Sequence, residues 1–121
     1  MFLKSLVALV ALTALSFSSG DGKKERATFT IYGECGMCET RIENAINEME
    51  GVIWADWEEA TLELTVKYDT SKTSLDKIKQ KAAAIGHDTN EIRASEEAYE
   101  NLHPCCKYER PKSKSSDSGK K

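Results

Sequence analysis

Four cysteines carry the clearest chemical signal in this sequence, and they occur as two close pairs, Cys35 with Cys38 and Cys105 with Cys106. Thiolates bind soft metal ions and attack disulfides. The first pair has the Cys-x-x-Cys spacing, which at the start of a helix gathers both sulfurs on one side. A helix N-terminus also favours the thiolate, because its N–H groups are free and its dipole is positive there. Soft-metal capture and redox exchange at an exposed pair of thiols are therefore both predicted.

Hydrophobic periodicity places the first pair between a strand and a helix. Residues 28–32 are β-branched or aromatic, which is typical of a strand. After the pair, apolar side chains recur three, four and seven positions apart, as on one face of a helix. They are Ile42, Ala45, Ile46 and Met49. Gly51 ends this predicted helix, so Cys35 and Cys38 should lie at its N-terminus.

The next elements follow from the same patterns. Residues 52–57 and 62–68 are predicted strands, and the second alternates apolar with polar side chains as a half-buried strand does. The short connection between them suits a hairpin. Thr73 or Ser74 can cap a second helix, which ends at Gly86.

A weak final strand from His87 to Arg93 completes the predicted order β-α-β-β-α-β. This order predicts an α+β fold of the ferredoxin-like type, a four-stranded antiparallel sheet with two helices on one face. The loops after the first strand and before the last lie at the same end of such a sheet, so His87 should lie near Cys35 and Cys38. Ala94 would lie at the far end, about 20 Å away.

The N-terminal residues 1–20 read as a secretory signal peptide, with one early lysine, an apolar run and small residues at its end. The apolar run is shorter than the ~20 residues that cross a bilayer. No cysteine precedes Cys35, which argues against a lipid anchor. We expect an exported, periplasmic protein whose mature chain has no membrane span. Two close cysteine pairs near opposite ends of the mature chain also argue against a disulfide framework.

Charge is distributed unevenly along the chain. Residues 27–94 hold 7 Lys or Arg against 13 Asp or Glu, a formal net charge of −6. Such an acidic body argues against a nucleic-acid partner. Residues 109–121 are basic and rich in serine, so they are predicted to be a disordered tail.

Several short motifs around the first cysteine pair resemble the heavy-metal-associated domain over residues 27–94. They are Gly33-Glu34-Cys35-Gly36-Met37-Cys38, Ile42-x-x-Ala45-Ile46, Gly51-Val52, the Trp57 strand and Ala84-Ile85-Gly86-His87-Asp88. The resemblance implies that Cys35 and Cys38 hold a soft ion, Cu(I) first and Hg(II) or Zn(II) next. It implies a partner with a thiol site that transports or accepts the metal. His87 lies where relatives often have Tyr or Lys, and the loop before the pair lacks one residue and the usual buried Met.

The segment 95–108 lies outside the part of the chain that resembles this family. A short C-terminal helix over 95–102, followed by extended residues, is long enough to return to the first cysteine pair. His103, Cys105 and Cys106 are then candidates for additional ligands or for a lid, together with His87 from the preceding loop. Metal-related chemistry and a structural disulfide stay equally open for Cys105 and Cys106.

Two functions therefore compete at the sequence level. In the favoured one the protein captures and transfers a soft metal ion through Cys35 and Cys38 and is not an enzyme, because thiolate sites release ions by ligand exchange. In the alternative it is a periplasmic dithiol-disulfide oxidoreductase, in which Cys35 attacks a disulfide and Cys38 resolves the mixed disulfide. The predicted element order differs from that of thioredoxin-type enzymes, which favours the metal-binding function.

Overall fold

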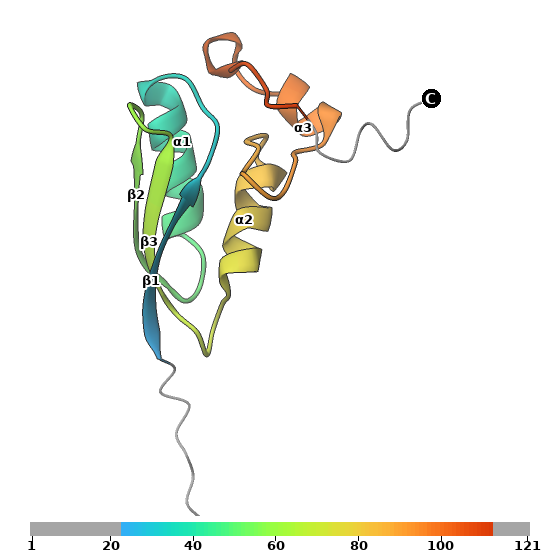
Figure 1. Ribbon diagram of the computed structural model, residues 1–121. Helices are drawn as coiled ribbons and strands as arrows, with labels where there is room; N and C mark the ends of the chain where they lie inside the picture. Colours follow the sequence, from blue (N-terminus) through green and yellow to red (C-terminus); the bar gives the residue numbers. More distant parts are fainter. Residues whose placement is uncertain (1–22, 113–121) are drawn as a thin grey trace, which may run out of the picture.

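The computed structural model describes residues 23–112 of the chain, and these form a three-stranded sheet with helices packed on one face (Figure 1). The expected signal peptide lies outside the described residues, as does 113–121. No helix in the described part is long and apolar enough to cross a membrane. The elements in order are β1 (Lys24–Thr30), α1 (Gly36–Asn47), β2 (Val52–Glu58), β3 (Glu63–Asp69), α2 (Leu75–Ala84), α3 (Glu96–Glu100) and the 3₁₀ turn η1 (Pro104–Cys106).

Strand β3 is the centre of the sheet and pairs antiparallel with both β1 and β2, in the order β1-β3-β2. Leu64 pairs with Phe29 on one side and with Trp57 on the other. All three side chains are buried, because residues at matching positions of neighbouring strands point to the same face of the sheet. The alternation predicted over 62–68 is therefore present in β3.

The hydrophobic core lies between this face of the sheet and the two long helices. Ile42 and Ile46 of α1 and Ile78 and Ala82 of α2 are fully buried in it. Ile42 and Ile46 confirm part of the predicted apolar face of α1, whereas Ala45 is half-buried and Met49 lies beyond the end of the helix at Asn47. Ser74 caps α2 by accepting a hydrogen bond from Lys77 N. Apolar side chains from the sheet and from both helices fill this core, so the hydrophobic effect holds the domain together.

The outer edge of β2 is covered by polar side chains from α1. Glu43 accepts a hydrogen bond from Trp57 N at 2.8 Å, and Asn47 both accepts from Ala55 N and donates to Ala55 O. Open strand edges expose unpaired backbone groups. Side chains of α1 therefore fix the helix against the strand that carries Trp57.

The predicted fourth strand over His87–Arg93 is wrong, because only a single bridge, between Ile31 and Thr89, joins this segment to the sheet. Thr89 forms a local turn instead. Its hydroxyl accepts hydrogen bonds from the backbone of Glu91 and Ile92, and its own N–H donates to Ile92 O. A threonine side chain that satisfies nearby N–H groups competes with sheet pairing.

This turn reverses the path of the chain before it reaches the far end of the sheet. Ala94 N donates to Asp88 Oδ1 at 2.7 Å, so the predicted position of Ala94, a strand length from the cysteine loop, is also wrong. The C-terminal segment, residues 95–112, therefore starts beside the loop that follows α2. It needs no long return path to reach the start of α1.

The C-terminal segment packs at the end of the molecule where α1 begins (Figure 1). Its helix α3 is shorter than the predicted 95–102 and is capped by Ser95, whose hydroxyl accepts a hydrogen bond from Ala98 N. The 3₁₀ turn η1 follows and contacts α1. Residues 109–112, the described part of the expected tail, are attached to the domain through Arg110.

Candidate metal centre

The loop after β1 runs so close to the core that a side chain at Gly33 would be tight against its neighbours. A Cβ on Gly33 would lie 3.0 Å from the Trp57 ring and 3.2 Å from Cys38 Cβ. Trp57 is itself buried and donates its indole N–H to Ile31 O at 3.0 Å. The indole therefore supports the loop from below and fixes where the first cysteine pair emerges.

Cys35 occupies the N-cap position of α1 and Cys38 lies in the first turn of that helix. The expectation of an exposed pair is wrong in one respect, because Cys38 is fully buried and Cys35 is half-buried. Met37, between them, is 49% exposed and does not replace a buried core methionine. The first cysteine pair is thus largely shielded from solvent.

Cys105 and Cys106 provide much of this cover. The Sγ atoms of Cys35 and Cys105 lie 3.9 Å apart, and the Cys35 thiol is also 3.4 Å from Cys105 O, to which it can donate. The sulfurs of Cys35, Cys105 and Cys106 all lie within 4.8 Å of one another. We call these three residues the thiol cluster.

Two further sulfur groups border the thiol cluster. Met37 Sδ lies 3.4 Å from Cys105 Sγ, so a thioether adjoins the exposed side of the cluster. Cys38 is not a member of the cluster, although it is one of the neighbours that raise the pKa of Cys106. All four cysteines are free thiols, and none of them forms a disulfide.

The cysteines differ in how readily they ionise. The nearby backbone N–H groups of Cys38 and Met37 at the helix N-terminus favour the thiolate and lower the pKa of Cys35. Burial, followed by the neighbouring Cys35 thiol, raises the pKa of Cys105. Burial and the adjacent Cys38 likewise raise the pKa of Cys106. Cys35 is therefore the thiol of the cluster that is most ready to bind a metal ion or attack a disulfide.

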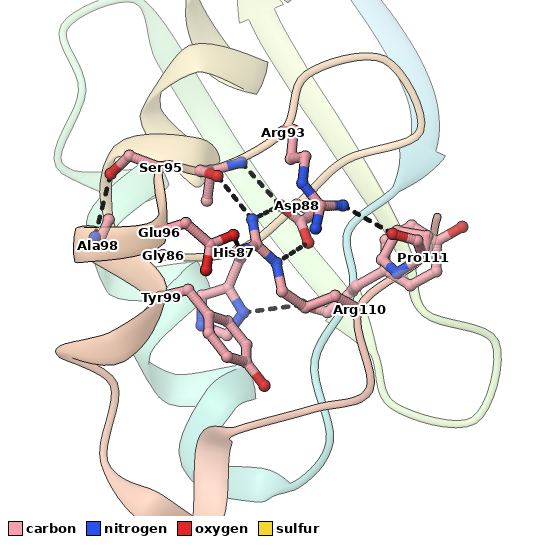
Figure 2. A network of polar contacts seen from close by, with 12 residues as sticks. Gly86, His87, Asp88, Arg93, Ser95, Glu96, Ala98, Tyr99, Arg110 and Pro111 are labelled. Atoms are coloured by element: carbon pink, nitrogen blue, oxygen red, sulfur yellow. Dashed lines mark hydrogen bonds and ion pairs between the residues drawn. The ribbon is translucent and has the colours of Figure 1, made fainter. Parts of the chain in front are cut away.

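A buried polar network joins the C-terminal segment to the loop after α2 (Figure 2). Arg110 makes two hydrogen bonds to the Asp88 carboxylate, both at 2.8 Å, and the Asp88 side chain is only 1% exposed. Arg110 also donates to Ala94 O and to Glu96. Bidentate Arg–carboxylate pairs are among the strongest and most directional hydrogen bonds in proteins.

Tyr108 forms the second half of this network. Its hydroxyl accepts a hydrogen bond from Asp88 N at 2.7 Å and donates to Gly86 O at 2.8 Å. Tyr99 in turn donates to Tyr108 O and contacts its ring edge-on. Tyr108, Arg110 and their partner Asp88 are called the clamp below. Sequence reasoning missed the clamp, since nothing in its local pattern links residues 88 and 110.

The two histidines lie outside the thiol cluster. His87 is fully buried, its Nδ1 lies 2.8 Å from Tyr32 O, and its ring stacks on Tyr108. Its Nε2 is buried without a hydrogen-bond partner in the described structure, and burial lowers the pKa of His87, so the ring is neutral. His103 is exposed and accepts a hydrogen bond from Cys105 N, which starts η1. Neither side chain joins the three sulfurs.

An open groove of about 570 Å³ leads to the cluster between α1 and the C-terminal segment. Its lining residues are Gly36, Met37, Thr40, Arg41, His103 and Cys106. The groove therefore brings solvent to the Cys106 side of the cluster, although the Cys106 side chain itself is buried.

Comparison with known proteins identifies the family of the part of the chain that carries the first cysteine pair. The profile of the heavy-metal-associated domain matches residues 28–88. The chain belongs to this family. The resemblance seen in the sequence is thus confirmed, although this heavy-metal-associated domain has three strands where four were expected. The family match ends at Asp88, so the C-terminal segment, with Cys105 and Cys106, lies beyond it.

Individual relatives of this heavy-metal-associated domain are metal-handling proteins. The copper chaperone CopZ of Staphylococcus aureus strain JH9 is 33% identical over 54 residues, which are 45% of this chain and 79% of that protein. Oxidized MerP from Ralstonia metallidurans CH34 superposes with a TM-score of 0.54 at 28% identity and covers 56% of this chain and 96% of its own. The Cu(I)-loaded N-terminal domain of a potential copper-translocating P-type ATPase from Bacillus subtilis superposes with a TM-score of 0.53 at 29% sequence identity. The match covers 60% of this chain and 100% of that chain.

Proposed function

We propose that this protein binds a soft metal ion, Cu(I) in the first instance, through thiolates that include Cys35 and Cys38, and passes it to a thiol site on another protein. The observation that carries the proposal is the gathering of free thiols at the N-terminus of α1 in a heavy-metal-associated domain. Thiolates suit soft ions, and bound ions move between thiolate sites by ligand exchange. No covalent bond of a substrate is made or broken, so the protein is not an enzyme.

Cu(I) is preferred because of the relatives and the donor atoms. The chaperone CopZ and the ATPase domain are both named for copper. Hg(II) stays in competition because the sequence resemblance also implied it. Sulfur donors with no carboxylate in the cluster favour either of these ions, and also Zn(II), over hard cations.

The receiving partner is proposed to be a metal transporter or metal acceptor with its own cysteine pair. Relatives of the chain include a chaperone and P-type ATPase domains, which supports such a partner. Export to the periplasm, proposed from residues 1–20, would place this exchange outside the cytoplasm.

The test is an anaerobic Cu(I) titration of the reduced protein against a chromophoric chelator. The parent should retain one ion, and Cys35→Ser and Cys38→Ser should each lower the apparent affinity, while the surface variant Glu109→Gln should not. Equal binding by the parent and both cysteine variants would show that the site is misplaced. The same titration with Hg(II) and Zn(II) ranks the metals.

A dithiol oxidoreductase remains the second candidate, and one observation favours it. Cys35 has a lowered pKa and its sulfur lies 3.9 Å from that of Cys105, so an attacking thiolate has a neighbouring thiol. Insulin reduction, measured beside the titration, separates the two functions. Turnover that depends on Cys35 together with weak Cu(I) retention would favour the enzyme.

A further inference from the structure

We propose that the C-terminal segment is part of the metal site, with Cys105 and Cys106 joining Cys35 to hold one soft ion in a three-thiolate site. This inference rests on the proposed function and deepens it, because it names the ligands present while the C-terminal segment is closed, and Cys38 of the proposed pair is not one of them. The family match ends at Asp88, so nothing in the matched domain supplies these two sulfurs. The carrying observation is the thiol cluster itself, whose sulfurs lie within 4.8 Å of one another.

The spacing of the sulfurs fits a bound ion with little movement. At the ~2.3 Å typical of a zinc–thiolate bond, three sulfurs around one ion in a plane lie about 4.0 Å apart. Cys35 and Cys105 are already 3.9 Å apart, and the remaining pairs are no farther than 4.8 Å. Closing the cluster on an ion thus needs shifts of less than about 1 Å in each sulfur–sulfur distance.

The cluster is held in place by structure that makes no contact with the ion. Arg110 and Tyr108 grip Asp88 and Gly86 through four hydrogen bonds of 2.7 to 2.8 Å. These two residues follow Cys106 within four positions along the chain. The clamp therefore fixes the backbone that carries the two sulfurs, as outer residues orient the ligands of metal sites.

Cys38 has a different place in this proposal. It is fully buried and is absent from the group of mutually close sulfurs. With the segment closed, Cys38 lies behind the three ligands. Cys38 could bind the ion only if the segment moved away, so the Cys35–Cys38 pair of the proposed function would be the ligand set of such an open form.

The groove beside the thiol cluster is bordered by sulfur atoms. Met37 and Cys106 both line it, so one side of the thiol cluster faces an opening. The Met37 thioether lies 3.4 Å from Cys105 Sγ and adds a soft sulfur beside the thiolates. Thiolates with a thioether neighbour select soft ions such as Cu(I) over Mg²⁺, Ca²⁺ and Mn²⁺.

The experiment uses the full chain loaded anaerobically with one equivalent of Cu(I). X-ray absorption should count three sulfur neighbours in the parent and two in Cys105→Ser/Cys106→Ser. Chelator competition should show at least about 10-fold weaker retention in that double variant, because even changes outside the ligand shell cost roughly 10–100-fold in metal affinity. Glu109→Gln, an exposed change in the same segment, is the matched control.

Because Cys106 is buried, the single variant Cys105→Ser keeps the test valid if the double variant misfolds, since Cys105 is exposed. Two sulfur neighbours in the parent, or unchanged retention in Cys105→Ser, would overturn the three-thiolate site and leave binding by Cys35 and Cys38 intact. If Cys35→Ser also leaves retention unchanged, the proposed function itself has failed. The outcomes of the two proposals are therefore separate.

Discussion

Asp88 and Arg110 form a buried bidentate ion pair that joins the last residue of the family match to the C-terminal segment (Figure 2). The pair spans 22 residues of sequence and the side chains are 1% and 10% exposed. Through it, a residue of the metal-binding domain decides where Cys105 and Cys106 lie. The position of Cys105 and Cys106 therefore depends on contacts between the heavy-metal-associated domain and the C-terminal segment.

Asp88→Asn should loosen the C-terminal segment and lower stability. Removing one partner of a buried ion pair leaves the other charge uncompensated, which costs about 3 kcal/mol. Thermal unfolding should show the loss, and Cys106 should alkylate faster in the folded variant. Glu96→Gln, which removes only the exposed contact of Arg110, should change both quantities little. Equal protection of Cys106 in Asp88→Asn and the parent would contradict the clamp.

The same ion pair predicts a defined acid sensitivity. Burial by itself raises the pKa of Asp88, but hydrogen bonds from Arg110 and Ala94 outweigh it, so the pKa lies below its ordinary value of about 3.9. A carboxyl with a lowered pKa stabilises the fold above its unfolded pKa and loses this contribution as the pH falls through the folded pKa. The stability difference between the parent and Asp88→Asn should therefore shrink below about pH 4. Urea unfolding at several pH values measures it.

Alkylation of the reduced apo-protein should follow the ionisation and burial of the four thiols. Cys35 should react first near neutral pH, because helix N–H groups lower its pKa and only the thiolate is reactive. Cys38 and Cys106 should react last, since both are buried. Mass spectrometry of peptides after brief iodoacetamide treatment gives the order. In urea the four should react at similar rates, and the same order in urea as in buffer would refute the structural explanation.

Gly33→Ala should disturb the packing beneath the loop that carries Cys35, where Trp57 and Cys38 lie. Its new methyl group would meet the Trp57 ring at 3.0 Å and Cys38 Cβ at 3.2 Å, both in the core. Such overpacking costs roughly 1–3 kcal/mol and should shift the loop that carries Cys35. Gly36→Ala is the matched control, because a Cβ there meets nothing within 4 Å. A destabilisation by Gly36→Ala as large as that by Gly33→Ala would contradict this account.

The metal-free domain should be folded. Leu64, Val66, Ile42, Ile46 and Ile78 are all fully buried, so burial of apolar surface suffices without an ion. Far-UV circular dichroism of the reduced apo-protein should show helix and strand, and addition of Cu(I) should raise the melting temperature without creating structure. A coil spectrum that becomes ordered only with metal would place this chain with the small zinc domains that fold on loading.

Much of this protein follows from the sequence alone. The Cys-x-x-Cys spacing before an apolar helix face placed Cys35 and Cys38 at the start of α1, and alternation identified β3. These features are readable because helix and strand periods report local backbone geometry against a single buried face. The motifs around the first pair also identified the family correctly.

Other features were decided only by the tertiary structure. Thr89 used its hydroxyl to close a turn, which removed the fourth strand and brought Ala94 back to Asp88. The Asp88–Arg110 pair then fixed the second thiol pair over the first, and this enclosed Cys38. Such contacts join side chains far apart in the chain through hydrogen bonds with no periodic signature. Their strength comes from burial, which exists only once the surrounding elements have packed.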